Sequence, residues 1–191
     1  MKQINYYILE HFENSNFSIL ERLHINKDTG NHHYNYHPKT KDELKELVKK
    51  LINERGDDAD LNDIDTSEIT NMTELFFNSE FNGNISNWDV SNVKNMNSMF
   101  AYSKFTGDIS NWDVSKVEDM YSMFCNSKFN GDISNWDVSN VENMRFMFMG
   151  AKFTGTNGDI SKWDVSNVKN MQFMFYDSPL EKNTPKWYKK K

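Results

Sequence analysis

A sequence unit that recurs about every 24 residues places the strongest limit on how this chain can fold. The stretch NISNWDVSNVKNMNSMFAYSKFTG, residues 84–107, is followed by near copies at 108–131 and 132–155, and Trp88, Trp112 and Trp136 stand at the same position of each copy. The next tryptophan, Trp163, comes late because residues 156–158 are inserted. A fixed period of this length is the signature of repeat proteins, whose units stack because no single unit can bury its apolar face.

The same frame extends back into a degenerate unit, in which Met72 stands one repeat before Met96. The sequence therefore predicts three parts. A leader and a capping helix occupy residues 1–59, about five repeat units occupy 60–178, and a C-terminal cap with a basic tail occupies 179–191. With 37% hydrophobic and 14% aromatic residues, the chain is expected to fold despite its 26% of charged residues.

Within each unit, the apolar residues follow two different periods. Trp112 and Val114 are two residues apart, which is the period of a short strand. Apolar residues at offsets of 0, 3, 6 and 7 within 117–124 fit one or two helical turns instead. Each unit is therefore predicted to pair a short parallel strand with a short helical turn, and the predicted fold class is an α/β repeat solenoid.

An amphipathic helix is predicted near residues 41–54, directly before the first unit. Its apolar stripe recurs at the helical period through Leu44, Leu47, Val48, Leu51 and Ile52. Thr40 and Glu43 have the spacing of a capping box, and Gly56 follows the stripe as a stop signal. We expect this helix to cover the N-terminal end of the repeat core, because an uncovered end would expose apolar side chains.

The repeat pattern I-x-x-W-x-V-S-x-x-V-x-x-M-x-x-M-F-x-x-S-x-F resembles the BspA-type leucine-rich repeat. It is closer still to the W-D-V-S-N-V-x-N-M-x-x-M-F variant found in bacterial surface proteins. The resemblance covers residues 60–177 and implies a leucine-rich-repeat-like right-handed coil. It also implies a bacterial or phage-encoded protein that serves as an adhesion or protein-interaction surface.

Charge and composition argue against several classes of partner. A net charge of −6 and a pI near 5.4 disfavour nucleic-acid binding, which needs clustered Lys and Arg. No stretch is long and apolar enough for a membrane span, and the N-terminus lacks the pattern of a secretory signal peptide. A complete chain would then be cytoplasmic or virion-associated, and export by another route would place it on the cell surface.

The sequence offers three candidate metal sites, and each has a simpler interpretation. The run HHYNYH at 32–37 lacks a fourth ligand at a recognisable spacing. A repeated aspartate could form a calcium-binding column, but each one is expected to face outward and to accept hydrogen bonds from nearby Ser or backbone amides; these are Asp89, Asp113, Asp137 and Asp164. The paired methionines of each unit fit a stacked core better than a soft-metal site. No metal or other cofactor is predicted.

No Ser-His-Asp arrangement, phosphate-binding glycine loop or H-E-x-x-H motif stands at a recognisable spacing, so the protein is predicted not to be an enzyme. The lone Cys125 stands at a variable repeat position and is not expected to be a nucleophile. The function favoured is a protein-interaction module. Its alternatives are an adhesin that binds glycans or a host surface and a structural protein that self-assembles; the oligomeric state stays open.

Candidate contact residues come from the positions that vary between units while the core positions stay constant. These positions follow the first Met and the Met-Phe pair of each unit, and stacking should align them as columns on one surface. Tyr, Arg and large apolar residues are common interface anchors. The predicted partner-binding residues are Tyr102, Tyr121, Arg145, Phe146, Phe173 and Tyr176, and the histidine-bearing leader is a further candidate.

Overall fold

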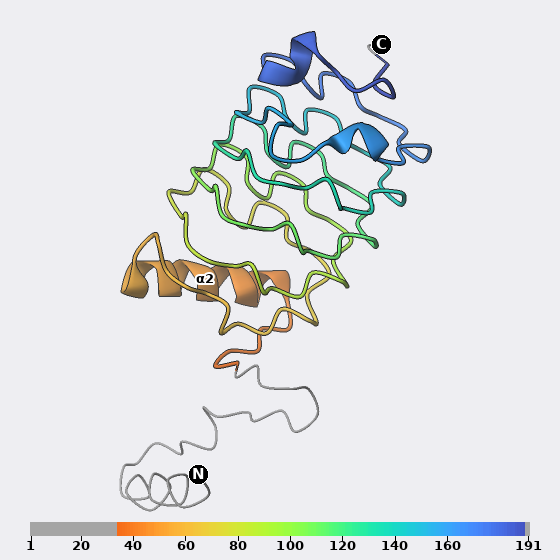
Figure 1. Cartoon of the computed structure of the whole chain (residues 1–191). Helices are drawn as coiled ribbons and strands as arrows, with labels where there is room; N and C mark the ends of the chain where they lie inside the picture. The colour runs from red at the N-terminus through yellow and green to blue at the C-terminus, as the bar shows by residue number, and fades with distance from the viewer. Residues whose placement is uncertain (1–33, 190–191) are drawn as a thin grey trace, which may run out of the picture.

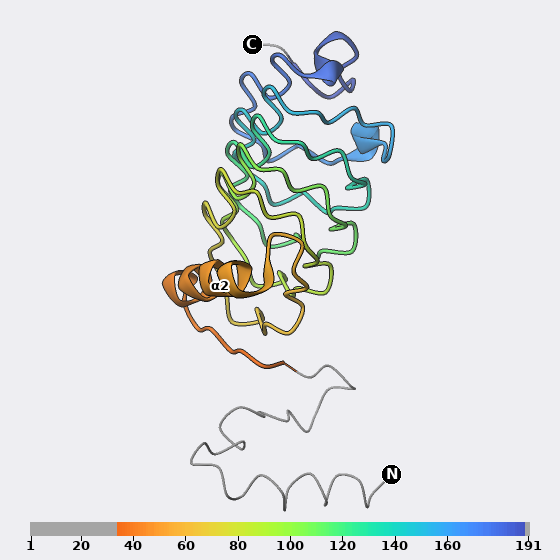
Figure 2. The same ribbon diagram turned by 90° about the vertical axis from the view of Figure 1, so that its left-hand side faces the viewer.

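The computed structural model describes residues 34–189, which form a stack of coils (Figure 1). One α-helix, α2 (Lys41–Arg55), lies at the N-terminal end of the stack, and the C-terminal segment lies at the opposite end (Figures 1 and 2). Two short 3₁₀ helices follow late in the chain, η2 (Ile160–Lys162) and η3 (Pro179–Lys182). The leader proposed as a contact surface lies outside the described residues, apart from 34–40.

The predicted α/β repeat solenoid, with a strand and a helical turn in every unit, is wrong. Between residues 34 and 189 there is no sheet, and no unit of the repeat contains an α-helix. The strand-type pairing between neighbouring coils of this part is limited to isolated parallel bridges: Asp60 to Asn84, Asn71 to Asn95, Asn95 to Asp119, Asp119 to Asn143, and Asn143 to Asn170. The coils are built from tight turns, so the strand-and-helix architecture of a leucine-rich-repeat coil is not present.

Tight turns replace the predicted helical turn because of one repeated backbone conformation. Ser122 has φ 52° and Asn126 has φ 53°, whereas an α-helix requires φ near −63°. Each lies at the third position of a four-residue turn, closed by the amide of Met123 or Ser127. Positive φ at that position is what a type II turn requires. Offsets of 0, 3, 6 and 7 therefore mark successive turns here.

Alternate amides on this turn side donate to the next coil instead of donating within a helix. Ser98 N donates to the carbonyl of Tyr121 at 2.8 Å. Two residues on, Phe100 N donates to the carbonyl of Met123 at 2.9 Å. The pattern repeats from coil to coil and satisfies polar backbone groups that stacking would otherwise bury unpaired.

The predicted strand around each tryptophan is also a turn. The Asp113 carboxylate accepts from the Ser115 amide at 3.0 Å, and Val117 N bonds back to the Val114 carbonyl. The link between coils on this side is made by a side chain, because Trp112 Nε1 donates to the Ile85 carbonyl at 3.2 Å. A spacing of two residues thus places Trp and Val in the core without any strand pairing.

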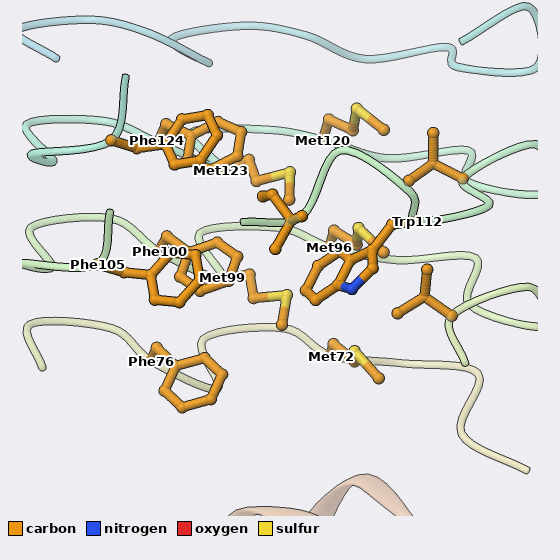
Figure 3. Close-up of a cluster of buried hydrophobic side chains, with 14 of the residues drawn as sticks. Met72, Phe76, Met96, Met99, Phe100, Phe105, Trp112, Met120, Met123 and Phe124 are labelled. Carbon is orange, nitrogen blue, oxygen red and sulfur yellow. The ribbon is translucent and has the colours of Figure 1, made fainter. Parts of the chain in front are cut away.

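The core is a set of columns in which each residue lies over its counterpart one unit away (Figure 3). Phe76, Phe100 and Phe124 stack with ring centroids 5.4 and 5.7 Å apart. The aromatic column contains Phe76, Phe100, Phe124, Phe148 and Phe175, and all five are buried. Met96 and Met120 lie in a second column beside Trp112. The interpretation of the methionines as core is confirmed for the paired methionines of the inner coils and for Met174, whereas Met171 is only partly buried.

Helix α2 has the start and the stop that the sequence predicts. Thr40 Oγ1 accepts from the Glu43 amide at 3.2 Å, while the Glu43 carboxylate reaches back to the Lys39 amide at 2.7 Å. Gly56, with φ 91°, donates to the Ile52 carbonyl and ends the helix. The stripe residues Leu44, Val48 and Leu51 are buried in the same apolar cluster as the coils.

The C-terminal tail keeps the period of the repeat. Trp187 stands one regular repeat after Trp163, its ring stacks on Trp163 at 6.3 Å, and its Nε1 donates to the Ile160 carbonyl at 2.9 Å. Trp187 therefore occupies the tryptophan position of a partial sixth unit.

Candidate partner-binding surface

The six residues predicted to bind a partner lie on the turn side of the coils, and none belongs to the buried core. Tyr102, Phe173 and Tyr176 are 52%, 49% and 54% exposed. The other three are partly buried; these are Tyr121, Arg145 and Phe146. The variable positions of the repeat therefore do form a surface, although its residues do not all come together.

Three of the six residues have an unusual backbone conformation. Tyr102, Phe146 and Phe173 have φ values of 60°, 61° and 56°. Large residues rarely adopt positive φ, and such residues are often found where a site stores strain. Here the same conformation recurs at Glu74 and Ser98 in other coils, so it belongs to the turn geometry of the repeat.

Four aromatic rings form a continuous strip across the last three coils. Tyr121 meets Phe146 edge-on at 5.7 Å, and Phe146 stacks on Phe173 at 5.7 Å. Phe173 in turn meets Tyr176 edge-on at 6.1 Å. We call these four residues the aromatic strip. Such ring pairs add to the energy of burial, and their contact holds the side chains in defined positions before any partner arrives.

Arg145 lies over this strip with its charge uncompensated by any side chain in the described part of the protein. Its guanidinium carbon is 4.4 Å from the centroid of the Phe146 ring, a cation–π contact. Its Nε is buried without a hydrogen-bond partner, and no carboxylate between residues 34 and 189 comes within ion-pair distance. Arg55, by contrast, is paired with Asp63 at 2.9 Å. The guanidinium of Arg145 is thus positioned to donate hydrogen bonds to an external carboxylate.

Tyr102 lies apart from the strip and pairs with a residue that the sequence reasoning missed. Phe77, 48% exposed, meets Tyr102 edge-on at 5.6 Å. Phe77 stands one repeat before Ala101, so the degenerate unit already contained the signal. Phe77, but not Tyr102, also lines a groove of about 320 Å³ between α2 and the first coil, together with Lys49 and Ile52.

The aspartate column is occupied by structural hydrogen bonds, as expected. Each of its carboxylates accepts from the amide of the serine two residues later, at 2.9 to 3.0 Å. Hydrogen bonds from the Ser115 side chain and amide lower the pKa of Asp113, and those from Ser166 lower the pKa of Asp164. Residues 34–189 contain no group of three or more His, Cys, Asp or Glu side chains that could hold a metal ion.

Two further groups that could carry chemistry, the His37 imidazole and the Cys125 thiol, lie in contacts within the fold. His37 Nδ1 lies 3.1 Å from an Asp65 oxygen; burial alone would raise the pKa of Asp65, but hydrogen bonds from Ser67 and His37 outweigh it and lower that pKa. The other residues of the histidine run, 32 and 33, lie outside the described part. Burial raises the pKa of the Cys125 thiol, which disfavours the reactive thiolate.

A family model described as "Mycoplasma protein of unknown function, DUF285" matches residues 43–154 and 102–191 of this chain. The chain belongs to that family. The matches cover most of the helix α2 and every repeat unit, and they agree with the BspA-like repeat that the sequence resembles. No curated protein and no solved structure matches the chain. Within the described residues, no helix of this family member has the length and apolar character needed to cross a membrane.

Proposed function

We propose that this protein is a non-enzymatic protein-binding module whose contact surface is the aromatic strip together with Arg145. The observation that supports this most is the unpaired guanidinium of Arg145 lying on Phe146, inside a row of partly exposed rings. Tyr and Arg are enriched among the residues that dominate binding energy at interfaces. We further propose that the chain is of the surface-protein variant with the W-D-V-S-N-V repeat.

The strip suits protein recognition because its side chains are held before binding. Phe146 N donates to the Gln172 carbonyl of the next coil at 3.1 Å, so the backbone beneath the rings is tied into the stack. Stacking on an aromatic face also holds the planar guanidinium of Arg145, which can then meet a carboxylate with two parallel hydrogen bonds. Little ordering entropy remains to be lost when a partner binds.

The test is a quantitative pull-down from the native host, followed by affinity measurement with the purified partner. The double variant Tyr121→Ala, Arg145→Ala is expected to bind at least about tenfold more weakly, because two anchor residues are lost. The control is Phe77→Ala, Tyr102→Ala, which removes a more exposed aromatic pair outside the strip. Its affinity should stay within about twofold.

Three different results would contradict the proposal, and each points to another binding mode. Unchanged affinity of the strip variant would show that the partner binds elsewhere. Binding to a glycan array that depends on Tyr121 would favour an adhesin, since tyrosine rings stack on sugars. Concentration-dependent growth in light scattering, lost in the strip variant, would favour self-assembly.

A further inference from the structure

The C-terminal end of the stack is covered less completely than any inner coil. In the fourth unit Val138, Val141 and Met144 are at most 1% exposed. Their counterparts in the fifth unit are only partly buried, and they line a groove of about 500 Å³ together with Gln172, Lys169 and Trp187; these counterparts are Val165, Val168 and Met171. The groove is what remains of the space that another coil would fill.

Backbone amides that donate from one coil to the next also reach this end, where no further coil follows within the described residues. In the fourth unit Met144 N donates to Asn170, and Phe146 N donates to Gln172. The equivalent amides in the fifth unit, those of Met171 and Phe173, donate to no carbonyl within residues 34–189. Two amides spaced two residues apart therefore present the pattern by which one coil receives the next.

The tail covers only the adjacent part of this end. Trp187 and Tyr188 pack on Phe175 at 6.1 and 5.1 Å, and the Asp177 amide is taken by the carboxylate of Glu181. Trp187 and Lys189 of the tail border the groove beside Met171, but no described carbonyl of the tail accepts from the amides of Met171 and Phe173. These amides without a carbonyl acceptor span only residues 171–173, which fits a peptide better than a folded domain.

Charges along one column indicate the chemistry of that peptide. Lys94 pairs with Glu118 of the following coil at 3.1 Å, and Glu142 pairs with Lys169 at 2.7 Å. Lys169 is the last member of the column and lines the groove, as does Lys189. By the pattern of Lys94, the position beyond Lys169 favours an acidic side chain.

We propose that this edge binds an acidic peptide segment, which adds to the stack as a further partial coil. Alternate carbonyls of the peptide accept from the amides of Met171 and Phe173. An acidic residue placed just before these carbonyls pairs with Lys169, and an apolar residue enters the groove over Val168. This is strand-addition recognition adapted to a stack of turns. It does not depend on the proposed role of the aromatic strip.

The chain itself supplies the probe. The synthetic peptide VEDMYSMF has the sequence of residues 117–124, which bind the Met96 and Ser98 amides and Lys94 in just this way inside the stack. Fluorescence anisotropy of the labelled peptide against the full chain should show saturable binding. Lys169→Glu should weaken it at least about fivefold, because a rim charge pair is reversed.

The charge exchange controls for altered folding. The peptide VKDMYSMF should bind the Lys169→Glu protein more tightly than it binds the wild type. Val168→Asp should abolish binding of both peptides, and Lys128→Glu, an exposed lysine away from the edge, should leave it unchanged. The lack of saturable binding, or equal binding of both peptides by wild type, would overturn the proposal. Sedimentation of the protein as a dimer that Val168→Asp dissociates would also overturn it, by assigning the edge to a second copy.

Discussion

At the scale of single residues, the tryptophan of each unit is held in the fold in two separate ways. Its ring is at least 95% buried among the Phe and Met columns, and its Nε1 donates to a carbonyl of the preceding coil. The first contribution is apolar burial, and the second is a hydrogen bond between coils to a carbonyl that also accepts from an amide of its own coil, as Ile85 does from Trp88 N. One side chain thus packs in the core of its own coil and forms a hydrogen bond to the preceding coil.

Replacing Trp112 with Ala should lower the free energy of unfolding by about 3 to 5 kcal/mol, because the change leaves a large cavity and removes the hydrogen bond from Trp112 Nε1 to the Ile85 carbonyl. Urea denaturation followed by circular dichroism measures this. Tyr102→Ala, at an exposed ring, is the control and should cost less than about 1 kcal/mol. An unchanged unfolding midpoint for Trp112→Ala would show that this ring is not part of the core.

The positive-φ residues allow a second test at this scale. Asn126→Val should cost about 1 to 2 kcal/mol, because a β-branched residue is strained at φ 53°. Asn126→Gly should stay within about 0.5 kcal/mol of wild type, since glycine adopts this conformation freely. Lys128→Val, exposed and at ordinary φ, is the matched control. If both Asn126 variants melt together, the left-handed turn is not required.

At the scale of elements, α2 differs from the coils because it satisfies its backbone internally and contributes only its apolar face. Leu44, Val48 and Leu51 cover the first coil, which has no earlier unit to stack on. The helix caps the N-terminal end of the stack but does not repeat the geometry of the coils. Its caps at Thr40 and Gly56 set its length locally, so its position in the sequence can be read before the fold is known.

Leu51→Ala should destabilise the protein by about 2 to 5 kcal/mol through a cavity between α2 and the coils. Hydrogen exchange should at the same time accelerate in α2 and in the first unit before it does so in the third. Lys50→Ala, on the exposed face of the same helix, should stay within about 0.5 kcal/mol of wild type. Equal effects of the two changes would mean that α2 does not cover the core.

At the scale of the whole molecule, the repeated aspartate carboxylates make the free energy of unfolding depend on pH. Hydrogen bonds from serine amides and hydroxyls lower the pKa of Asp108, Asp113, Asp159 and Asp164. A pKa that is lower in the folded than in the unfolded state adds stability above the unfolded pKa, near 3.9 for Asp. That stability is lost as the pH falls through the folded pKa.

We therefore expect the urea midpoint to be flat from about pH 7 to pH 5 and to fall below about pH 4. Asp113→Asn is the informative variant, since an amide oxygen can still accept from Ser115 but does not titrate. Its acid-induced loss should be smaller than that of the wild type. A midpoint that does not change between about pH 6 and pH 3 would contradict this account.

The candidate surface was predictable in composition and only partly in arrangement. The varying positions of the repeat were enough to select Tyr121, Arg145 and Phe173 as surface residues. Nothing in the spacing indicates that Arg145 lies on Phe146 or that Tyr102 pairs with Phe77 instead of joining the strip. Those contacts depend on how far each coil is offset from its neighbour.

The period, the buried columns and the capped helix α2 follow from the amino-acid sequence alone, because each depends on a local pattern of apolar residues and turn formers. The backbone of each coil was decided by stacking. In an α-helix the amides would donate to carbonyls of the same unit. In the stack, every second amide donates to a carbonyl of the next coil instead, as the Ser98 amide does to the Tyr121 carbonyl. That pairing occurs together with positive φ at two residues of each unit, four positions apart, and the coils contain neither a strand nor an α-helix. Periodicity cannot show it, since turns and helices space the same apolar residues alike.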